Sequence, residues 1–136
     1  MEKFKFFPHT SDVRIEAYGN NLEECFENGA LALFEIMTNT EKVREIKKIE
    51  DSVSSESLEE LLYSFLEKLL IYHDSDNLLF KTFKIKIKKN AKYKLEFVAF
   101  GEEFDPKRHE SRTLVKAITF HEIEIKENKI HFIVDI

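Results

Sequence analysis

Residues 6–19, FFPHTSDVRIEAYG, join two strand-like segments through a short polar turn. Charged and aromatic residues alternate before the turn, and small apolar residues alternate with larger polar ones after it. A period of two is typical of a half-buried strand, and Pro8 ends the first segment because proline cannot donate to a β-ladder. The sequence therefore predicts two N-terminal strands joined by a polar turn, His9 to Asp12.

Two segments show the three-and-four residue spacing of amphipathic helices. Asn21 and Glu24 form a capping-box pattern before the first, and Ser57 and Glu60 form one before the second. The apolar stripes comprise Leu22, Cys25, Phe26, Ala30, Leu33, Phe34 and Met37 in the first helix, and Leu58, Leu61, Leu62, Phe65, Leu69 and Tyr72 in the second.

The remaining segments alternate like strands. A short exposed strand is expected over 46–53, between the helices, and four more over 78–89, 92–102, 114–127 and 129–136, the last two forming a hairpin through KENK. The predicted fold is α+β, a single domain over residues 1–136, with element order ββαβα followed by four strands. Its economical architecture is a two-layer sandwich, with two helices packed on one face of a mostly antiparallel sheet.

The composition fits a tightly structured globule. The 136 residues suffice for one core, and 13 phenylalanines with only 3 glycines argue against disorder. Cys25, the only cysteine, is expected to be a buried apolar residue rather than a nucleophile. Since no apolar run approaches the ~20 residues of a membrane helix and no signal peptide is visible, a cytoplasmic location is expected.

The charge balance gives no general attraction to nucleic acid, because the formal net charge is −5. The one basic cluster, Lys81 to Lys94, alternates lysine with phenylalanine and isoleucine. A solvent-facing strand surface or edge protection by lysine explains this pattern more simply than RNA contact does.

Several common enzyme classes are disfavoured. The five histidines show no paired spacing for zinc, no Gly-x-Ser-x-Gly elbow surrounds a serine, and three glycines do not build a phosphate-binding loop.

A split cation site is one interpretation of two acidic positions. Asp12 ends the polar turn, and Asp135 precedes Ile136 in a segment apolar enough to dock as a strand. If the two segments meet, the carboxylates and the main-chain oxygens of Ile136 form an oxygen-rich pocket suited to Ca²⁺, Mg²⁺ or Mn²⁺. The simpler alternative is that Asp12 only stabilises its turn, and on the residues alone it is favoured.

The loop GEEFDPKRHESRT, 101–113, also breaks the alternation. Its charges serve either to solvate the loop or to form a basic surface, including Lys107 and His109, for a phosphate or an acidic partner. Lys116, between apolar neighbours, either extends its ammonium to solvent or pairs with a carboxylate.

With these segments taken together, the chain resembles the archeases. The resemblance rests on HTSDV at 9–13, KAITFH at 116–121 and the Asp-Ile ending, and it covers nearly the whole chain in order. It implies an accessory protein, not an enzyme, that helps an RtcB-type RNA-splicing ligase to become guanylylated by GTP and to turn over repeatedly in tRNA splicing.

The resemblance also implies site residues. The implied metal ligands are Asp12, Asp135 and Ile136, with Ca²⁺ the metal of the family and Mg²⁺ or Mn²⁺ as alternatives. His9 and Thr10 are expected to brace the turn. The implied partner is the ligase, with tRNA contacted indirectly or weakly and neither DNA nor membrane involved.

Lys107, His109 and Lys116 match the charged neighbourhood of the family and are candidates for partner contact. Two other functions stay open at this point. One is a metal-stabilised protein-interaction module without metal delivery, and the other, which lacks a positioned base, is a small metal-dependent hydrolase.

Overall fold

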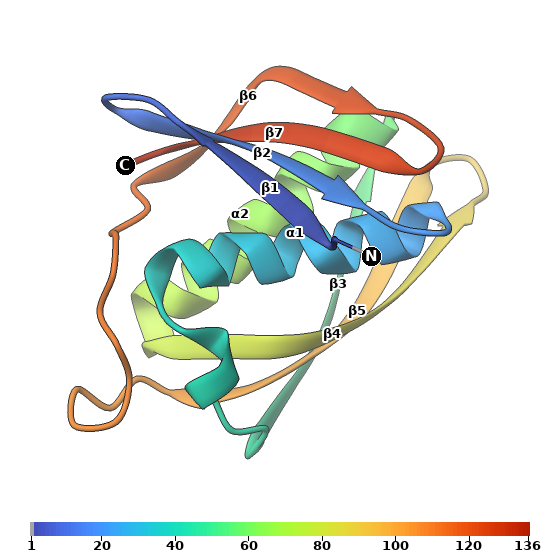
Figure 1. The fold of residues 1–136 in the computed structure, drawn as a ribbon. Coiled ribbons are helices and arrows are strands. Elements are labelled where there is room, and N and C mark those ends of the chain that lie inside the picture. Colours follow the sequence, from blue (N-terminus) through green and yellow to red (C-terminus); the bar gives the residue numbers. More distant parts are fainter. Residues whose placement is uncertain (1) are drawn as a thin grey trace.

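The computed structural model describes residues 2–136 (Figure 1). In chain order its elements are β1 (Phe4–Pro8), β2 (Asp12–Tyr18), α1 (Leu22–Met37), the 3₁₀ helix η1 (Thr40–Lys42), β3 (Lys47–Ser55), α2 (Leu58–Asp76), β4 (Leu78–Lys89), β5 (Tyr93–Glu103), β6 (Ala117–Ile125) and β7 (Lys129–Asp135). The element order matches the prediction. The largest boundary difference is in β6, which was expected from residue 114 and begins at Ala117.

The seven strands form two sheets. Sheet A has the order β1-β2-β7-β6 and sheet B the order β3-β5-β4, and every neighbouring pair is antiparallel. The helices lie between the sheets, where α1 contacts β2 and β4 while α2 contacts β6 and β3 (Figure 1). The predicted α+β class, with two helices on antiparallel strands, is confirmed. The strands are divided between two sheets instead of forming one, so both sides of the helix pair are covered.

The width of the apolar surface on α1 explains the second sheet. Nine of its 16 residues are buried, more than a stripe facing one sheet needs. On one side, a Cβ added to Gly29 would lie 3.0 Å from Ile130 and 3.3 Å from Phe132 of β7. On the other side, the Phe34 ring lies 5.4 Å from that of Phe80 in β4. The helix therefore packs closely against both sheets.

Both predicted N-caps form. The side chain of Asn21 accepts the N–H of Glu24 at 2.9 Å, and Ser57 accepts that of Glu60 at 3.2 Å. These bonds satisfy N–H groups that have no partner within the helix. They fix where each helix starts, and so how the flanking strands enter the two sheets.

The connection between β5 and β6 determines what surrounds one end of sheet A. Residues 104–116 run from sheet B to sheet A past one end of the helix pair (Figure 1). They arrive beside the turn between β1 and β2 and beside the end of β7, where the polar segments identified in the sequence lie.

Candidate metal centre

Asp12 and Asp135 lie opposite each other on neighbouring strands. Asp12 is the first residue of β2, Asp135 the last of β7, and the two are register partners in the antiparallel pair. Directly opposed residues project from the same face, with Cβ atoms typically about 5 Å apart. The expectation that these two positions meet is thus confirmed, whereas metal binding itself stays a prediction.

Main-chain hydrogen bonds hold the strand ends around the pair. The N–H of His9 donates to the carbonyl of Asp12 at 2.9 Å, and the N–H of Ile136 donates to Ser11 at 3.0 Å. The N–H of Lys116 donates to the carbonyl of Asp135 at 2.8 Å. The β1–β2 turn, the end of β7 and the segment before β6 are therefore fixed to one another at this point.

The two carboxylates have few hydrogen-bond donors. Oδ1 of Asp12 is buried and lacks a hydrogen-bond partner within the described residues, while Oδ1 of Asp135 accepts from the Thr119 hydroxyl at 3.3 Å. A buried carboxylate oxygen without a donor is unfavourable, and so are like charges directly opposite in a sheet. A divalent cation would offset both the missing donor and the repulsion between the carboxylates, so the residues present fit the expected metal.

The donor set is oxygen, and it is incomplete as side chains alone. Among residues 2–136 no group of three or more His, Cys, Asp and Glu side chains is placed to hold a metal. Two carboxylates would therefore need main-chain oxygens, for which Ile136 is adjacent, together with water. Ca²⁺ accepts such mixed sets of six to eight oxygens, and Mg²⁺ usually retains several waters.

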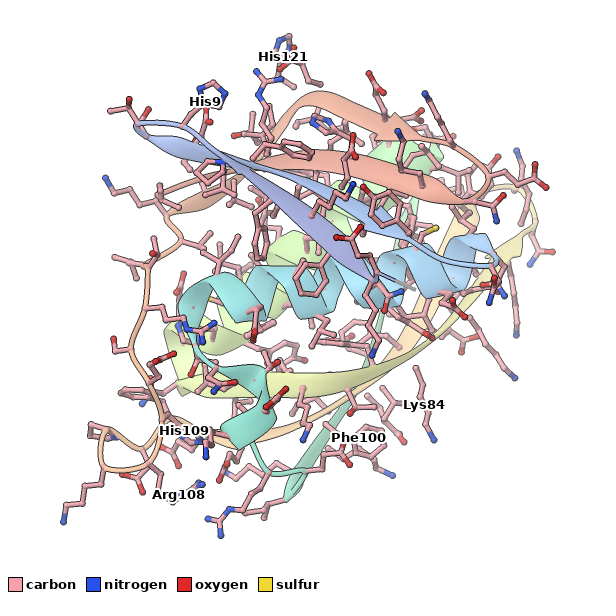
Figure 2. All side chains as sticks on the ribbon, viewed as in Figure 1. His9, Lys84, Phe100, Arg108, His109 and His121 are labelled. Atoms are coloured by element: carbon pink, nitrogen blue, oxygen red, sulfur yellow. The ribbon has the colours of Figure 1, made fainter. Side chains whose placement is uncertain are left out.

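His9 and Thr10 are the residues expected to brace the turn between β1 and β2. Their side chains are exposed, and His9 stabilises the turn through its main-chain N–H. His9 and His121 both project from the outer side of sheet A (Figure 2).

The three partner-contact candidates separate into two kinds. Lys107 and Lys116 are exposed and remain candidates. The side chain of His109 is buried, so the prediction that it contacts a partner is corrected. Its Nδ1 accepts the N–H of Asp105 at 2.8 Å, which places the ring proton on Nε2, from where it donates to Glu102 at 2.8 Å. His109 anchors the loop.

Glu102 is a structurally important residue that sequence reasoning missed. It is only 5% exposed, and its carboxylate accepts hydrogen bonds from Arg108, from the main-chain N–H of Arg44 at 2.7 Å and from His109. Burial opposes ionisation, but these donors outweigh it and hold the pKa of Glu102 at about 2. The run Gly-Glu-Glu at a strand end resembles a solvated terminus, so periodicity offered no signal.

No helix among residues 2–136 is long and apolar enough to cross a membrane.

Comparison with known proteins identifies relatives over the full length of the chain. The model of the archease protein family matches residues 4–136. The chain belongs to the archease family.

Individual archeases agree with this assignment. The protein archease of Sulfurisphaera tokodaii is 50% identical, with 100% of both chains covered. The solution structure of protein 1598 from Methanobacterium thermoautotrophicum has a TM-score of 0.88 and 42% identity, again over 100% of both chains. A Thermotoga maritima crystal structure described as an archease and possible chaperone shares the fold, with a TM-score of 0.56 at 22% identity and 96% and 94% of the two chains covered. The matched range, residues 4–136, spans positions 12 and 135.

Proposed function

We propose that this archease-family protein activates an RtcB-type RNA-splicing ligase in tRNA processing, and that it does so with a divalent cation bound at the Asp12–Asp135 pair. The activity proposed is promotion of ligase guanylylation by GTP and of repeated turnover. The single observation that supports it best is a pair of opposed carboxylates with one buried oxygen that receives no donor from residues 2–136. The description of the Thermotoga relative as a possible chaperone agrees with an accessory role.

Asp12, Asp135 and the main-chain oxygens of Ile136 would hold the cation, with Ca²⁺ the first candidate and Mg²⁺ or Mn²⁺ the others. When bound, a divalent cation supplies positive charge that neutralises nucleotide phosphates. The hydroxyl of Thr119 orients the Asp135 carboxylate. The main-chain bonds of His9, Lys116 and Ile136 keep the strand ends in place, so the two carboxylates face each other before any partner binds.

The surroundings of the pair are suited to contact with another protein. Phe7, which lies opposite Arg14 in sheet A, is 44% exposed, and Leu114, two residues before Lys116, is 67% exposed. Exposed aromatic and aliphatic side chains beside a polar rim are common in protein interfaces. We propose that the ligase docks over this end of sheet A, with Lys116 at its edge, and that both proteins are cytoplasmic. Lys107 is next to Arg108 and His109, which are anchored to Glu102 of sheet B, so it is a separate candidate for partner contact.

The test measures guanylylation of the ligase by GTP with Asp12→Ala and Asp135→Ala variants. We expect activation to fall at least tenfold in each variant, because each removes one of the two carboxylates that would hold the cation. Asp74→Ala, at an exposed position near the end of α2, is the matched control and should leave activation unchanged. Full activation by both site variants would contradict the proposal.

A protein-interaction module with a purely structural metal is the second candidate, because the exposed Phe7 and Leu114 can act without a cation. A chelator distinguishes the two functions. Loss of activation with the circular dichroism spectrum retained favours a direct role for the cation. Loss of the folded spectrum together with activation favours a structural metal.

A further inference from the structure

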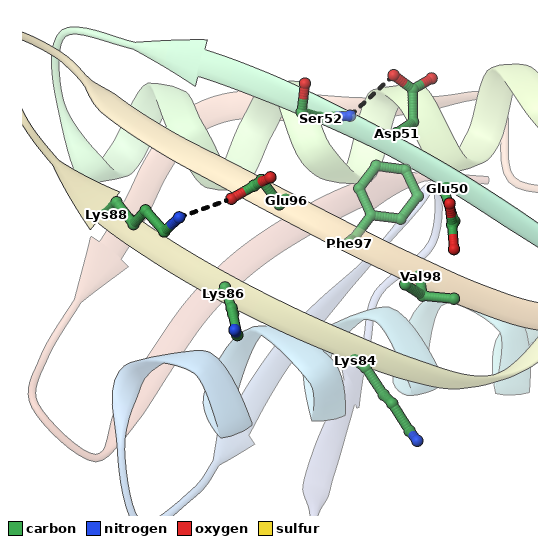
Figure 3. Close-up of a pocket in the computed structure, with 9 residues that line it drawn as sticks. All are labelled: Glu50, Asp51, Ser52, Lys84, Lys86, Lys88, Glu96, Phe97 and Val98. Atoms are coloured by element: carbon green, nitrogen blue, oxygen red, sulfur yellow. Dashed lines mark hydrogen bonds and ion pairs between the residues drawn. The ribbon is translucent and has the colours of Figure 1, made fainter.

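The outer face of sheet B carries a row of lysines. Lys84, Lys86 and Lys88 alternate along β4 and are exposed, and they lie opposite Val98, Glu96 and Lys94 of β5. Figure 3 shows the three lysines extending from one strand beside Glu96 and Val98. Alternate residues of a strand are about 7 Å apart, which is comparable with the spacing of successive phosphates in an extended nucleic-acid strand.

The same face continues onto β3 as a shallow hollow. Glu50 and Ser52 lie opposite Val98 and Glu96, and together with the β4 lysines they line a depression of about 550 Å³. One step further along, Lys48 lies opposite Phe100. All three strands of sheet B therefore contribute to one continuous surface.

Positive charge predominates on this surface although the whole chain is negative. The solvent-facing positions hold five lysines, Lys48, Lys84, Lys86, Lys88 and Lys94, against two glutamates, Glu50 and Glu96.

Two of the β4 lysines form no ion pair with another described residue. Within residues 2–136, Lys88 pairs with Glu96 at 3.2 Å, whereas Lys84 and Lys86 have no carboxylate within 4.0 Å. The hydrogen bond from Lys88, followed by the charges of Lys88, Lys94 and Lys86, lowers the pKa of Glu96. The local potential is therefore positive, and two ammonium groups remain available to an anionic partner.

An aromatic ring adjoins these free cations. Phe100 is only partly buried on the outer side of the central strand, and the Lys84 ammonium lies 5.8 Å from its ring centroid. The ring and Val98 give the basic face an apolar strip along β5. Cations beside an exposed aromatic face are what single-stranded nucleic acids require, because phosphates bind the cations while bases stack on the ring.

Protection of a sheet edge does not explain the whole arrangement. Strand β4 is an edge strand, and lysines on an edge discourage pairing with other chains. Strand β5 is central, however, and it contributes Lys94 and the partly exposed Phe100. Lys94 also faces Lys88 directly, a pairing that is unfavourable without an anion.

We propose that the outer face of sheet B binds single-stranded RNA, with Lys84, Lys86 and Lys88 on consecutive phosphates and a base stacked on Phe100. The choice of RNA over DNA rests on the proposed function. A single strand is inferred because an open sheet face cannot enter the narrow major groove of duplex RNA, whose bases are in any case already stacked on one another. This direct contact goes beyond the proposed function, in which tRNA is reached through the ligase.

The first test measures fluorescence anisotropy of a labelled oligouridine with the full chain, without ligase. The variant Lys84→Gln/Lys86→Gln/Lys88→Gln should bind at least tenfold more weakly, and its dependence of log K on log salt should be less steep by about 2, three contacts at about 0.7 each. The control variant is Lys3→Gln/Lys5→Gln/Lys126→Gln, which removes the same charge from exposed positions elsewhere. Equal binding by the two triple variants would overturn the proposal.

A second variant separates RNA from an acidic protein as the partner. Phe100→Leu keeps the charge and should weaken oligouridine binding about fivefold or more, since a stacked base contributes ~1–3 kcal/mol, without changing the salt dependence. Poly-glutamate should compete poorly. If poly-glutamate competes as well as RNA and Phe100→Leu has no effect, the face binds acidic protein instead and the proposal is wrong.

A third measurement keeps this inference distinct from the ligase proposal. Asp12→Ala should bind oligouridine as tightly as wild type, because the centre lies on the other sheet. If Asp12→Ala loses ligase activation while the β4 triple variant retains RNA binding, the proposal of RNA binding by sheet B is wrong and the proposed function of the Asp12–Asp135 pair is supported. If Asp12→Ala still activates the ligase and the triple variant loses RNA binding, RNA binding by sheet B is supported and the proposed function of the Asp12–Asp135 pair is wrong.

Discussion

Glu102 and the Asp12–Asp135 pair are two carboxylate arrangements that differ in their supply of donors. Glu102 is buried and receives hydrogen bonds from Arg108, His109 and the main chain of Arg44. Asp12 has a buried oxygen with no donor among the described residues, and the side chain opposite is another carboxylate. The first arrangement has its donors within the chain, whereas the second lacks donors that the proposed cation would replace. Donor supply thus distinguishes a structural anchor from a candidate binding site.

The two arrangements are also connected through the chain. Glu102 fixes Arg108 and His109, so it orders the loop that crosses from sheet B to sheet A. That loop continues to Lys116, whose N–H holds Asp135. The anchor is therefore expected to affect stability most, and the pair to affect cation binding most.

The largest expected effect is that of Glu102→Ala. Removing a buried carboxylate leaves Arg108, His109 and the Arg44 N–H without their acceptor, and we expect unfolding free energy to fall by about 4 kcal/mol. Urea denaturation measures it. Glu103→Ala is the control, because Glu103 is exposed and its contact with Lys47 is 3.9 Å long; it should change stability by less than about 0.5 kcal/mol. Similar losses in both variants would show that Glu102 is not a special anchor.

The next effect is acid sensitivity. The folded pKa of Glu102 is about 2, below the ordinary value of 4.5, so Glu102 contributes full stability above about pH 4.5. That contribution is lost as pH falls from 4.5 toward 2, and it amounts to roughly 3 kcal/mol. Denaturation at pH 6, 4 and 3 would show the loss, and Glu102→Gln should remove this part of the pH dependence. An unchanged pH profile in Glu102→Gln would contradict the assignment.

How far the sequence predicts these features depends on what periodicity can report. It located both helices and all seven strands, and the apolar run before Asp135 indicated a docked strand that brings this residue to Asp12. It could not divide the strands between two sheets, because alternation reports a face and not a neighbouring strand. It could not find Glu102 either, since the three donors of Glu102 come from residues 44, 108 and 109, and only the folded chain assembles them.

A third effect concerns the pair. We expect Ca²⁺ at about 100 times its dissociation constant to stabilise the wild type by about 2.7 kcal/mol, because a ligand bound only to the folded state shifts the unfolding equilibrium. Thermal unfolding with and without Ca²⁺ measures this. Asp12→Ala should lose the increase, while Glu102→Gln should retain it from a lower starting stability. Equal Ca²⁺ stabilisation of the wild type and Asp12→Ala would exclude the pair as the site.

The smallest expected effect on the unfolding free energy is that of Asp12→Asn, and it has the opposite sign to the effect of Glu102→Gln. This difference in sign distinguishes the two arrangements most clearly. Without metal, Asp12→Asn removes the repulsion from Asp135 and adds an amide that can donate to it. We therefore expect unfolding free energy to rise by about 0.5 kcal/mol, within the range for like charges opposite in a sheet. Glu102→Gln should lower it, since the amide replaces one acceptor by a donor facing Arg108. Denaturation of both variants in chelator makes the comparison. A loss of stability in Asp12→Asn would mean that the Asp12 carboxylate already has its donors, and the argument for a cation between the two strands would fail.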